Sequence, residues 1–288
     1  MTAQGGTSFD ESLLIVPGSG DEMLGVLARP SPDAPQHPTG VVIVVGGPQT
    51  RVGSHRQFVL LARALAGAGY PCLRFDYTGM GDSPGPKPDF EAAEDDIRRA
   101  CDALLAAAPG CRRIVLWGLC DGATAAVFHA VTDERVTAVI AANPWARSDS
   151  TRSAALVKTH YGSRLRSAEF WKKLASGGID VVATAKELVG HVARARNGGR
   201  DDKSGSSEPL NLPQRFATAL RKIQARVHLQ LSGNDLTAAE FEVAMKTAGI
   251  LDTLEASVLR LADADHTFSD PIAWSAVIDD TLSVLRQK

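Results

Sequence analysis

The stretch that most constrains this chain is Gly118-Leu119-Cys120-Asp121-Gly122, which lies between two apolar segments. Residues 114–117 are typical of a buried strand, and the small and apolar residues after Gly122 are typical of a helix. A strand that turns sharply into a helix strains the central residue of the turn, and the flanking glycines remove collisions that side chains would make there. The pattern is the G-x-S-x-G nucleophile elbow with cysteine in place of serine. We therefore expect Cys120 to lie at a sheet edge beside a helix N-terminus, whose partial positive charge favours thiolate over thiol.

The composition excludes several classes of function. Hydrophobic residues make up 44% and charged residues 22% of the 288 residues, which is ordinary for a globular protein with a sizeable core. A formal net charge of −2 argues against a nucleic-acid partner. Residues 1–10 do not resemble a secretory signal, and no apolar run approaches the roughly 20 residues that span a bilayer. The expectation is a cytoplasmic protein without a membrane span, whose oligomeric state the sequence leaves open.

The four cysteines do not form a metal-binding pattern. Their spacing matches neither a zinc site nor a haem attachment site, and the chain is too long to be a small disulfide scaffold. Cys72, Cys101 and Cys111 are interpreted as inert buried residues, because cysteine is among the residues most often found in protein interiors. We expect reduced thiols and no cofactor or metal.

Strand-like and helix-like segments alternate along most of the chain. Such alternation predicts an α/β fold, with a mostly parallel central sheet covered by helices on both faces. The expected strands are residues 12–16, 23–28, 41–45, 72–75, 114–117, 136–141, 227–231 and 257–261, the first two forming a hairpin.

The alternation pauses over residues 146–212, which are polar and helical in pattern without a clear strand. We interpret this region as an inserted helical cap over the strand ends. The core would then comprise residues 1–145 and 213–288.

Polar residues predict where several helices begin. Ser54 with Gln57, and Thr237 with Glu240, have the spacing of a capping box. Asp89 is the expected cap of a helix through residue 108. Asp270, followed by Pro271 in the first turn, is the expected start of the final helix.

Three candidate reactive residues follow predicted strands, in the order Cys120, Asp235 and His266. Ligands of parallel sheets bind beyond the carboxyl ends of the strands, so these side chains are expected to converge. His266 would take the proton of Cys120 or hold its thiolate as an ion pair, and Asp235 would fix the imidazole tautomer. Asp263 and Asp265 are alternatives to Asp235, although both lie close to His266 in sequence.

The remaining histidines are interpreted by default as surface polar residues, with two of them, His55 and His160, as possible neighbours of the pocket. They are His37, His55, His129, His160, His191 and His228.

An acyl-transfer reaction also needs donors for the oxyanion that forms in the tetrahedral intermediate. The backbone N–H of Asp121, next after the cysteine, is one candidate. The second is expected from the loop after the strand at residues 41–45, where Pro48 has no N–H. Gly47 and Gln49 remain as alternatives.

Several segments resemble the α/β-hydrolase superfamily. Residues 75–83, Phe-Asp-Tyr-Thr-Gly-Met-Gly-Asp-Ser, are similar to its D-x-R-G-x-G-x-S turn, with Thr78 in place of the arginine. Residues 264–268 resemble its histidine loop, and the order nucleophile, acid, histidine is also that of this superfamily. More narrowly, residues 46–58, 116–122, 143–145 and 231–237 resemble exosortase A system-associated hydrolases.

The resemblance implies the α/β-hydrolase fold and a hydrolase. Combined with the cysteine, it predicts an acyl hydrolase of esterase or thioesterase type, acting on a small-molecule or carrier-bound acyl substrate through an acyl-cysteine intermediate. An acyltransferase is the main alternative, because a thioester is well suited to transfer onto an amine, alcohol or thiol. A non-catalytic binding protein of the same fold is the third interpretation.

Overall fold

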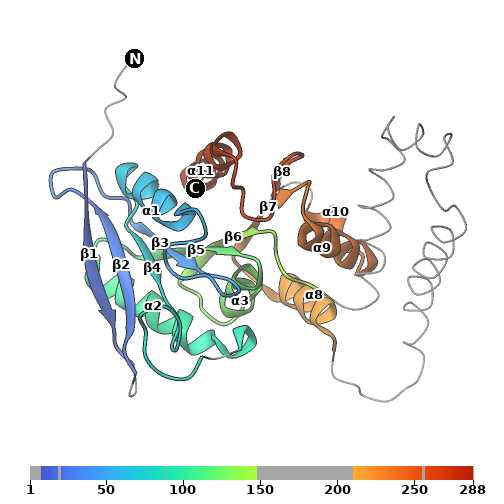
Figure 1. The fold of residues 1–288 in the computed structure, drawn as a ribbon, viewed down its shortest axis with the longest axis horizontal. Coiled ribbons are helices and arrows are strands. Elements are labelled where there is room, and N and C mark those ends of the chain that lie inside the picture. The colour runs from blue at the N-terminus through green and yellow to red at the C-terminus, as the bar shows by residue number, and fades with distance from the viewer. Residues whose placement is uncertain (1–7, 19–20, 88, 148–209, 255–256, 288) are drawn as a thin grey trace, which may run out of the picture.

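A computed structural model describes residues 8–18, 21–87, 89–147, 210–254 and 257–287 of the chain (Figure 1). Most of the predicted cap, residues 146–212, lies outside these ranges, so the division into core and cap stays a prediction. Among the helices within the described ranges, none combines the length and the hydropathy that a bilayer-crossing segment requires.

One eight-stranded sheet forms the centre of the described molecule. Its strand order is β1-β2-β4-β3-β5-β6-β7-β8. The β1–β2 and β2–β4 pairs are antiparallel, and every other neighbouring pair is parallel. The strands are β1 (Phe9–Val16), β2 (Met23–Pro30), β3 (Thr39–Val44), β4 (Cys72–Phe75), β5 (Arg113–Leu119), β6 (Val136–Ala142), β7 (Arg226–Ser232) and β8 (Val258–Leu261). The predicted strands and the N-terminal hairpin are confirmed, with ends that differ by a few residues.

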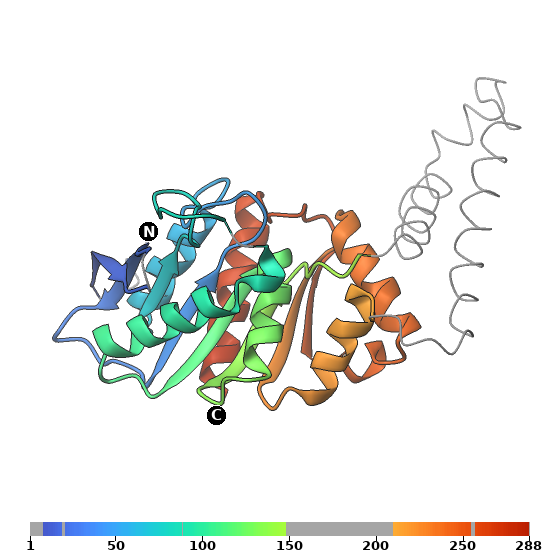
Figure 2. The ribbon, with the colours of Figure 1, turned by 90° about the horizontal axis from the view of Figure 1, so that it is seen from below.

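Helices cover both faces of the sheet (Figures 1 and 2). One face carries α1 (Gln57–Gly67) and α11 (Pro271–Arg286), and the other carries α2 (Glu94–Ala107), α3 (Asp121–Ala130) and α8 (Leu212–Lys222). The remaining helices are α9 (Leu236–Thr247), the short α10 (Leu251–Leu254) and the 3-10 turn η1 (Phe90–Ala92). This arrangement confirms the predicted α/β fold.

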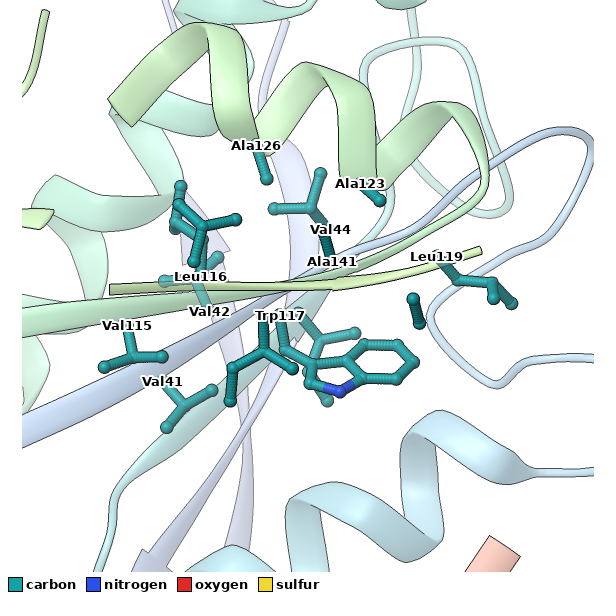
Figure 3. Close-up of a cluster of buried hydrophobic side chains, with 14 of the residues drawn as sticks. Val41, Val42, Val44, Val115, Leu116, Trp117, Leu119, Ala123, Ala126 and Ala141 are labelled. Atoms are coloured by element: carbon teal, nitrogen blue, oxygen red, sulfur yellow. The ribbon is translucent and has the colours of Figure 1, made fainter. Parts of the chain in front are cut away.

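The core explains why the central strands are apolar on both sides. In Figure 3, Leu116 points toward α3, where Ala123 and Ala126 face the sheet, and the neighbouring Trp117 points to the opposite side. Trp117 packs edge-on against Phe58 of α1 and Trp274 of α11, with ring centroids 5.9 and 6.1 Å apart. Successive residues of β5 therefore bury apolar surface in two separate helix layers, which is typical of a central parallel strand.

Two of the predicted helix starts are wrong. Helix α1 begins at Gln57, and Arg56, with φ of +64°, precedes it without a side-chain cap. The Ser54 hydroxyl instead accepts a hydrogen bond from the Gln49 side chain. Helix α2 begins at Glu94, because η1 separates it from Asp89.

A third predicted start is displaced by two residues. Asp235 caps α9 by accepting hydrogen bonds from the N–H groups of Thr237 and Ala238, so Thr237 lies inside the helix. Glu240 forms an ion pair with Arg147 instead of closing a capping box. The prediction for Asp270 is confirmed, because its carboxylate caps α11.

Candidate functional site

Cys120 occupies the turn between β5 and α3, as the elbow pattern predicts. Its backbone has φ of 60° and ψ of −127°, a region that non-glycine residues rarely adopt. The residue is the N-cap of α3, and its side chain is partly exposed. A Cβ atom at Gly122 would lie 2.5 Å from the carbonyl oxygen of Val45, and one at Gly118 would lie 2.7 Å from Ala123. The two glycines therefore allow the close approach of strand and helix that positions the sulfur.

His266 and Asp235 are in direct contact. The Nδ1 atom of His266 lies 2.9 Å from Oδ2 of Asp235, whose side chain is largely buried. Because Asp235 also caps α9, two helix N–H groups fix its carboxylate at 3.0 and 3.1 Å. The acid that orients the imidazole is thus held by the helix that follows β7. Of the two alternatives, Asp265 instead accepts hydrogen bonds from Thr267 and Ser269 within its own loop.

The electrostatics of His266 link it to both partners. Burial alone lowers the pKa of His266, but hydrogen bonds with Asp235 and Cys120, and the negative charges of both, raise this pKa to about 10. The structure therefore brings the imidazole of His266 between the Asp235 carboxylate and the Cys120 sulfur. With a pKa of about 10, the imidazole of His266 is in its charged form at neutral pH.

The loop that carries His266 is fixed by three side chains from elsewhere in the chain. Ser232 donates its hydroxyl to the carbonyl of Asp265 at 2.7 Å. Asn143 donates its amide to the carbonyl of His266 at 2.9 Å, and Nε2 of His55 lies 2.9 Å from the carbonyl of Thr267. Three successive carbonyls of the loop thus each have a side-chain partner from a different element.

Sequence reasoning missed Asn143 and Ser232 as positioning residues. Asn143 is fully buried with φ of +42°, and its amide also exchanges two hydrogen bonds with Ser232 at 2.8 Å. The available signal was an asparagine placed where β6 ends, next to the strand that precedes Asp235. The suggestion that His55 and His160 border the pocket stays a prediction: His55 contacts the histidine loop, and His160 lies outside the described residues.

The N–H groups of Gly47 and Gln49, the two alternatives for the second oxyanion donor, both have partners in this structure. The N–H of Gly47 and the N–H of Gly122, at 3.0 Å for the latter, both donate to Oδ1 of Asp121. The N–H of Gln49 donates to the carbonyl of Gly46 at 3.3 Å, within its own turn. Gly47 therefore faces the elbow directly, which favours it over Gln49 as the second donor.

The glycine-rich turn after β4 is braced by charge. Arg51 forms ion pairs with Asp76, which is buried, and with Asp82 at 2.6 Å. Thr78, the residue that departs from the superfamily pattern, donates its N–H and hydroxyl to Asp96 at 2.9 and 3.0 Å. Asp76 and Asp82 thus fix this turn through their shared contact with Arg51.

A cavity of about 480 Å³ lies next to the elbow. Its lining includes Gly47, Tyr77, Lys87 and Asp121. Most of the other lining residues are apolar: Val45, Pro48, Met80, Phe90 and Ala93. The volume is within the range of small-molecule pockets.

The other cysteines are buried, as expected, and burial raises the pKa of Cys101 to about 12. Cys101, His129 and Asp133 have potential ligand atoms within 4.8 Å of one another. However, Arg135 donates to both carboxylate oxygens of Asp133 at 2.7 and 2.8 Å. A guanidinium that already neutralises this carboxylate makes the group a better buried ion-pair network than a cation site. The prediction of a surface position for His129 is wrong, because it packs inside with Asp133 as its partner.

Comparisons with known proteins agree with this architecture. The comparison with curated proteins finds no match. An esterase from Pyrococcus furiosus superposes with a TM-score of 0.62 at 16% identity, covering 98% of this chain and 91% of that one. A putative dienelactone hydrolase from Klebsiella pneumoniae gives a TM-score of 0.59 at 15% identity over 98% and 100% of the two chains.

A lidless α/β serine hydrolase from Xanthomonas campestris gives a TM-score of 0.56 at 18% identity, over 96% of this chain and 94% of that one. At these identities the likenesses establish the fold alone. The model of the alpha/beta hydrolase family matches residues 41–277, well over half of the sequence. The chain belongs to the alpha/beta hydrolase family.

Proposed function

We propose that this protein is an acyl hydrolase of esterase or thioesterase type, in which Cys120 is the nucleophile, His266 the acid–base group and Asp235 its orienting partner. The observation that carries the proposal is the His266 imidazole, bonded at 2.9 Å to a helix-capping carboxylate and coupled to the sulfur of a strained elbow residue. Family membership supports a hydrolase.

The proposed reaction has two halves. The Cys120 thiolate attacks the acyl carbonyl, forming a C–S bond and a tetrahedral oxyanion. Collapse of this intermediate breaks the bond to the alcohol or thiol, which leaves with a proton from the His266 imidazolium. Water then attacks the thioester and gives its proton to His266, and the second collapse releases the carboxylic acid and restores the thiolate.

Asp235 contributes in both halves. Its carboxylate accepts from Nδ1 of His266, so the Nε2 atom is the one left to exchange protons with the sulfur, the leaving group and water. The electrostatic stabilisation it provides is greatest when the imidazole is charged.

The sulfur nucleophile is the reason to keep acyl transfer as a second candidate. An acyl-cysteine passes its acyl group to an amine, alcohol or thiol by the same steps, with that acceptor in place of water. A non-catalytic binding role is the third candidate, and it predicts no turnover at all. The acyl donor under each enzymatic reading is a small-molecule or carrier-bound ester or thioester handled in the cytoplasm. From the narrower resemblance, we also propose that the protein is an exosortase A system-associated hydrolase.

A panel of short-chain esters and thioesters tests the proposal and separates the candidates. Wild-type protein should turn over at least one member, and Cys120→Ala should lose about 10³-fold or more, since the covalent route is gone. Cys120→Ser is the matched control, because it retains a nucleophile at this position but replaces the thiol with a hydroxyl. Free acid as the only product in the presence of amines and alcohols supports hydrolysis, and capture by one acceptor supports transfer. Equal turnover by wild type and Cys120→Ala would contradict the proposal.

A further inference from the structure

The carboxylate of Asp121 occupies a backbone corner between the elbow and the loop after β3, which includes the N–H of Gly47, the favoured second oxyanion donor. Its Oδ1 atom accepts hydrogen bonds from the N–H groups of Gly47 and Gly122. A Cβ atom built at Gly46 would lie 2.6 Å from the same oxygen. The side chain of the residue after the nucleophile is thus folded back against the loop after β3, instead of pointing away from the elbow.

This position conflicts with the proposed reaction. The N–H of Gly47 is the donor that the structure favours for the oxyanion, and it is already used by an anion. An acyl oxygen that approached the corner would meet a like charge and an engaged donor. A substrate can therefore acylate Cys120 only after the Asp121 side chain leaves this position.

The adjoining cavity offers the carboxylate a destination. Lys87 and Tyr77 line the same cavity as Asp121. The Tyr77 hydroxyl is buried without a hydrogen-bond partner among the described residues, and burial, with the charges of Asp121 and Asp96, raises the pKa of Tyr77 so that the hydroxyl stays protonated. The Lys87 charge acts on Asp121 already in its present position. A phenol donor and an ammonium group are the partners that a displaced carboxylate needs.

Resting on the proposed function, we propose that Asp121 is a specificity-determining residue that occupies the oxyanion corner of the free enzyme. The carboxylate moves toward Lys87 and Tyr77 when a substrate binds. Until it moves, the Asp121 side chain limits access of the acyl oxygen to the oxyanion corner. Only substrates whose other contacts outweigh the cost of this displacement then acylate Cys120 efficiently, because the apparent affinity falls in proportion to the fraction of open enzyme.

The test compares Asp121→Ala with Asp121→Asn. Alanine empties the corner, whereas asparagine removes the charge but keeps an oxygen that accepts from the same two N–H groups. The probe is butyraldehyde, whose carbonyl carbon bonds to the Cys120 sulfur and whose oxygen then occupies the corner. Its affinity is measured as protection of Cys120 from iodoacetamide, a reagent that needs no oxyanion donors. Each variant is referred to its own alkylation rate without aldehyde, so altered thiol reactivity cancels.

We expect the aldehyde to protect Asp121→Ala at a concentration about tenfold or more lower than wild type, with Asp121→Asn within about threefold of wild type. An equal gain in affinity for the aldehyde in both variants would show that the charge of Asp121, and not its occupation of the corner, weakens binding. That result would overturn the proposal. So would weaker protection in Asp121→Ala, or no protection in any variant. Asp121→Gly repeats the measurement if thermal unfolding shows that the alanine variant is misfolded. The ester panel with Cys120→Ala decides the proposed function independently.

Discussion

At the scale of single residues, Asp235 combines two tasks that are usually assigned to different side chains. Its carboxylate caps α9 through two N–H groups and also holds Nδ1 of His266. Helix N-termini favour negatively charged partners, so one carboxylate serves both the start of α9 and the imidazole. The sequence predicted Asp235 as a partner of His266 from its position after a strand, and the structure has these two side chains in contact. The sequence prediction placed the helix cap two residues too late, because a Thr-x-x-Glu spacing also occurs inside a helix.

The same pair predicts how His266 titrates. Because Asp235 and Cys120 favour the charged imidazole, we expect His266 to stay protonated through neutral pH and to lose its proton near pH 10, measured from its ring resonances by NMR. The protonated form is favoured in the folded state, so its contribution to stability is fully present below about pH 6.5 and is lost as the pH rises toward 10. Cys120→Ala and Asp235→Asn each remove one negative partner, and both should lower the midpoint. A wild-type midpoint near 6.5 would refute this account of the site.

At the scale of elements, the elbow depends on the close packing of α3 against β3 and β5. A Cβ atom at Gly122 would lie 2.5 and 2.6 Å from the carbonyl oxygens of Val45 and Val44. These are backbone atoms in the centre of the sheet, which cannot rotate aside as a flexible side chain can. The position of Cys120 therefore depends on the packing of α3, β3 and β5 against one another. The spacing of the two glycines in the sequence reflects this packing.

Substitution of the elbow glycine tests this packing. Gly122→Ala should lower the free energy of unfolding by about 3 kcal/mol, the upper part of the range for overpacked sites, as measured by urea denaturation. Gly249→Ala is the matched control, because Gly249 has φ of +67° but no atom within 4 Å of the added Cβ. Only backbone strain of about 1–2 kcal/mol is expected there. An unchanged free energy of unfolding in Gly122→Ala would contradict this account, because Gly122 lies inside α3 without a positive φ and the contact with Val44 and Val45 is what opposes the added Cβ.

The helix starts show where element-level prediction fails. Ser54 and Gln57 have capping-box spacing, but the positive φ values of Gly53 and Arg56 turn the chain twice before α1 begins. A capping pattern reports which side chains can cap a helix, while the local backbone path decides which residue is in place to do so. The prediction for Asp270 is confirmed because Pro271 fixes the first helical position directly after it.

At the scale of the whole molecule, the sheet brings distant parts of the chain to one edge. Cys120, Asp235 and His266 follow β5, β7 and β8, and parallel strands place their carboxyl ends on the same side. The positions of the strands along the chain and the three candidate residues could be predicted, because each of these residues follows a recognisable apolar segment. The contacts of His55 and Asn143 with the histidine loop could not, because they join residues more than 100 positions apart and no local pattern encodes them.

The same limit applies to the oxyanion corner. The sequence predicted the backbone N–H of Asp121 as one donor and that of Gly47 or Gln49 as the second, since the elbow pattern specifies donors. It did not indicate that the Asp121 side chain would occupy the corner, because that depends on how the loop after β3 packs against the elbow. Side-chain direction at a strained turn follows from tertiary contacts that residue spacing does not report.

The central claim is that Cys120 becomes covalently acylated with the help of His266, and peptide mapping of the trapped acyl-enzyme tests it most directly. Wild-type protein quenched in acid during reaction with a short-chain acyl thioester should carry one acyl group, on the peptide that contains Cys120. His266→Gln should acquire it about 10²-fold or more slowly, as expected when an acid–base group is lost. An acyl group on another residue, or the same adduct formed equally fast by Cys120→Ala, would contradict the account.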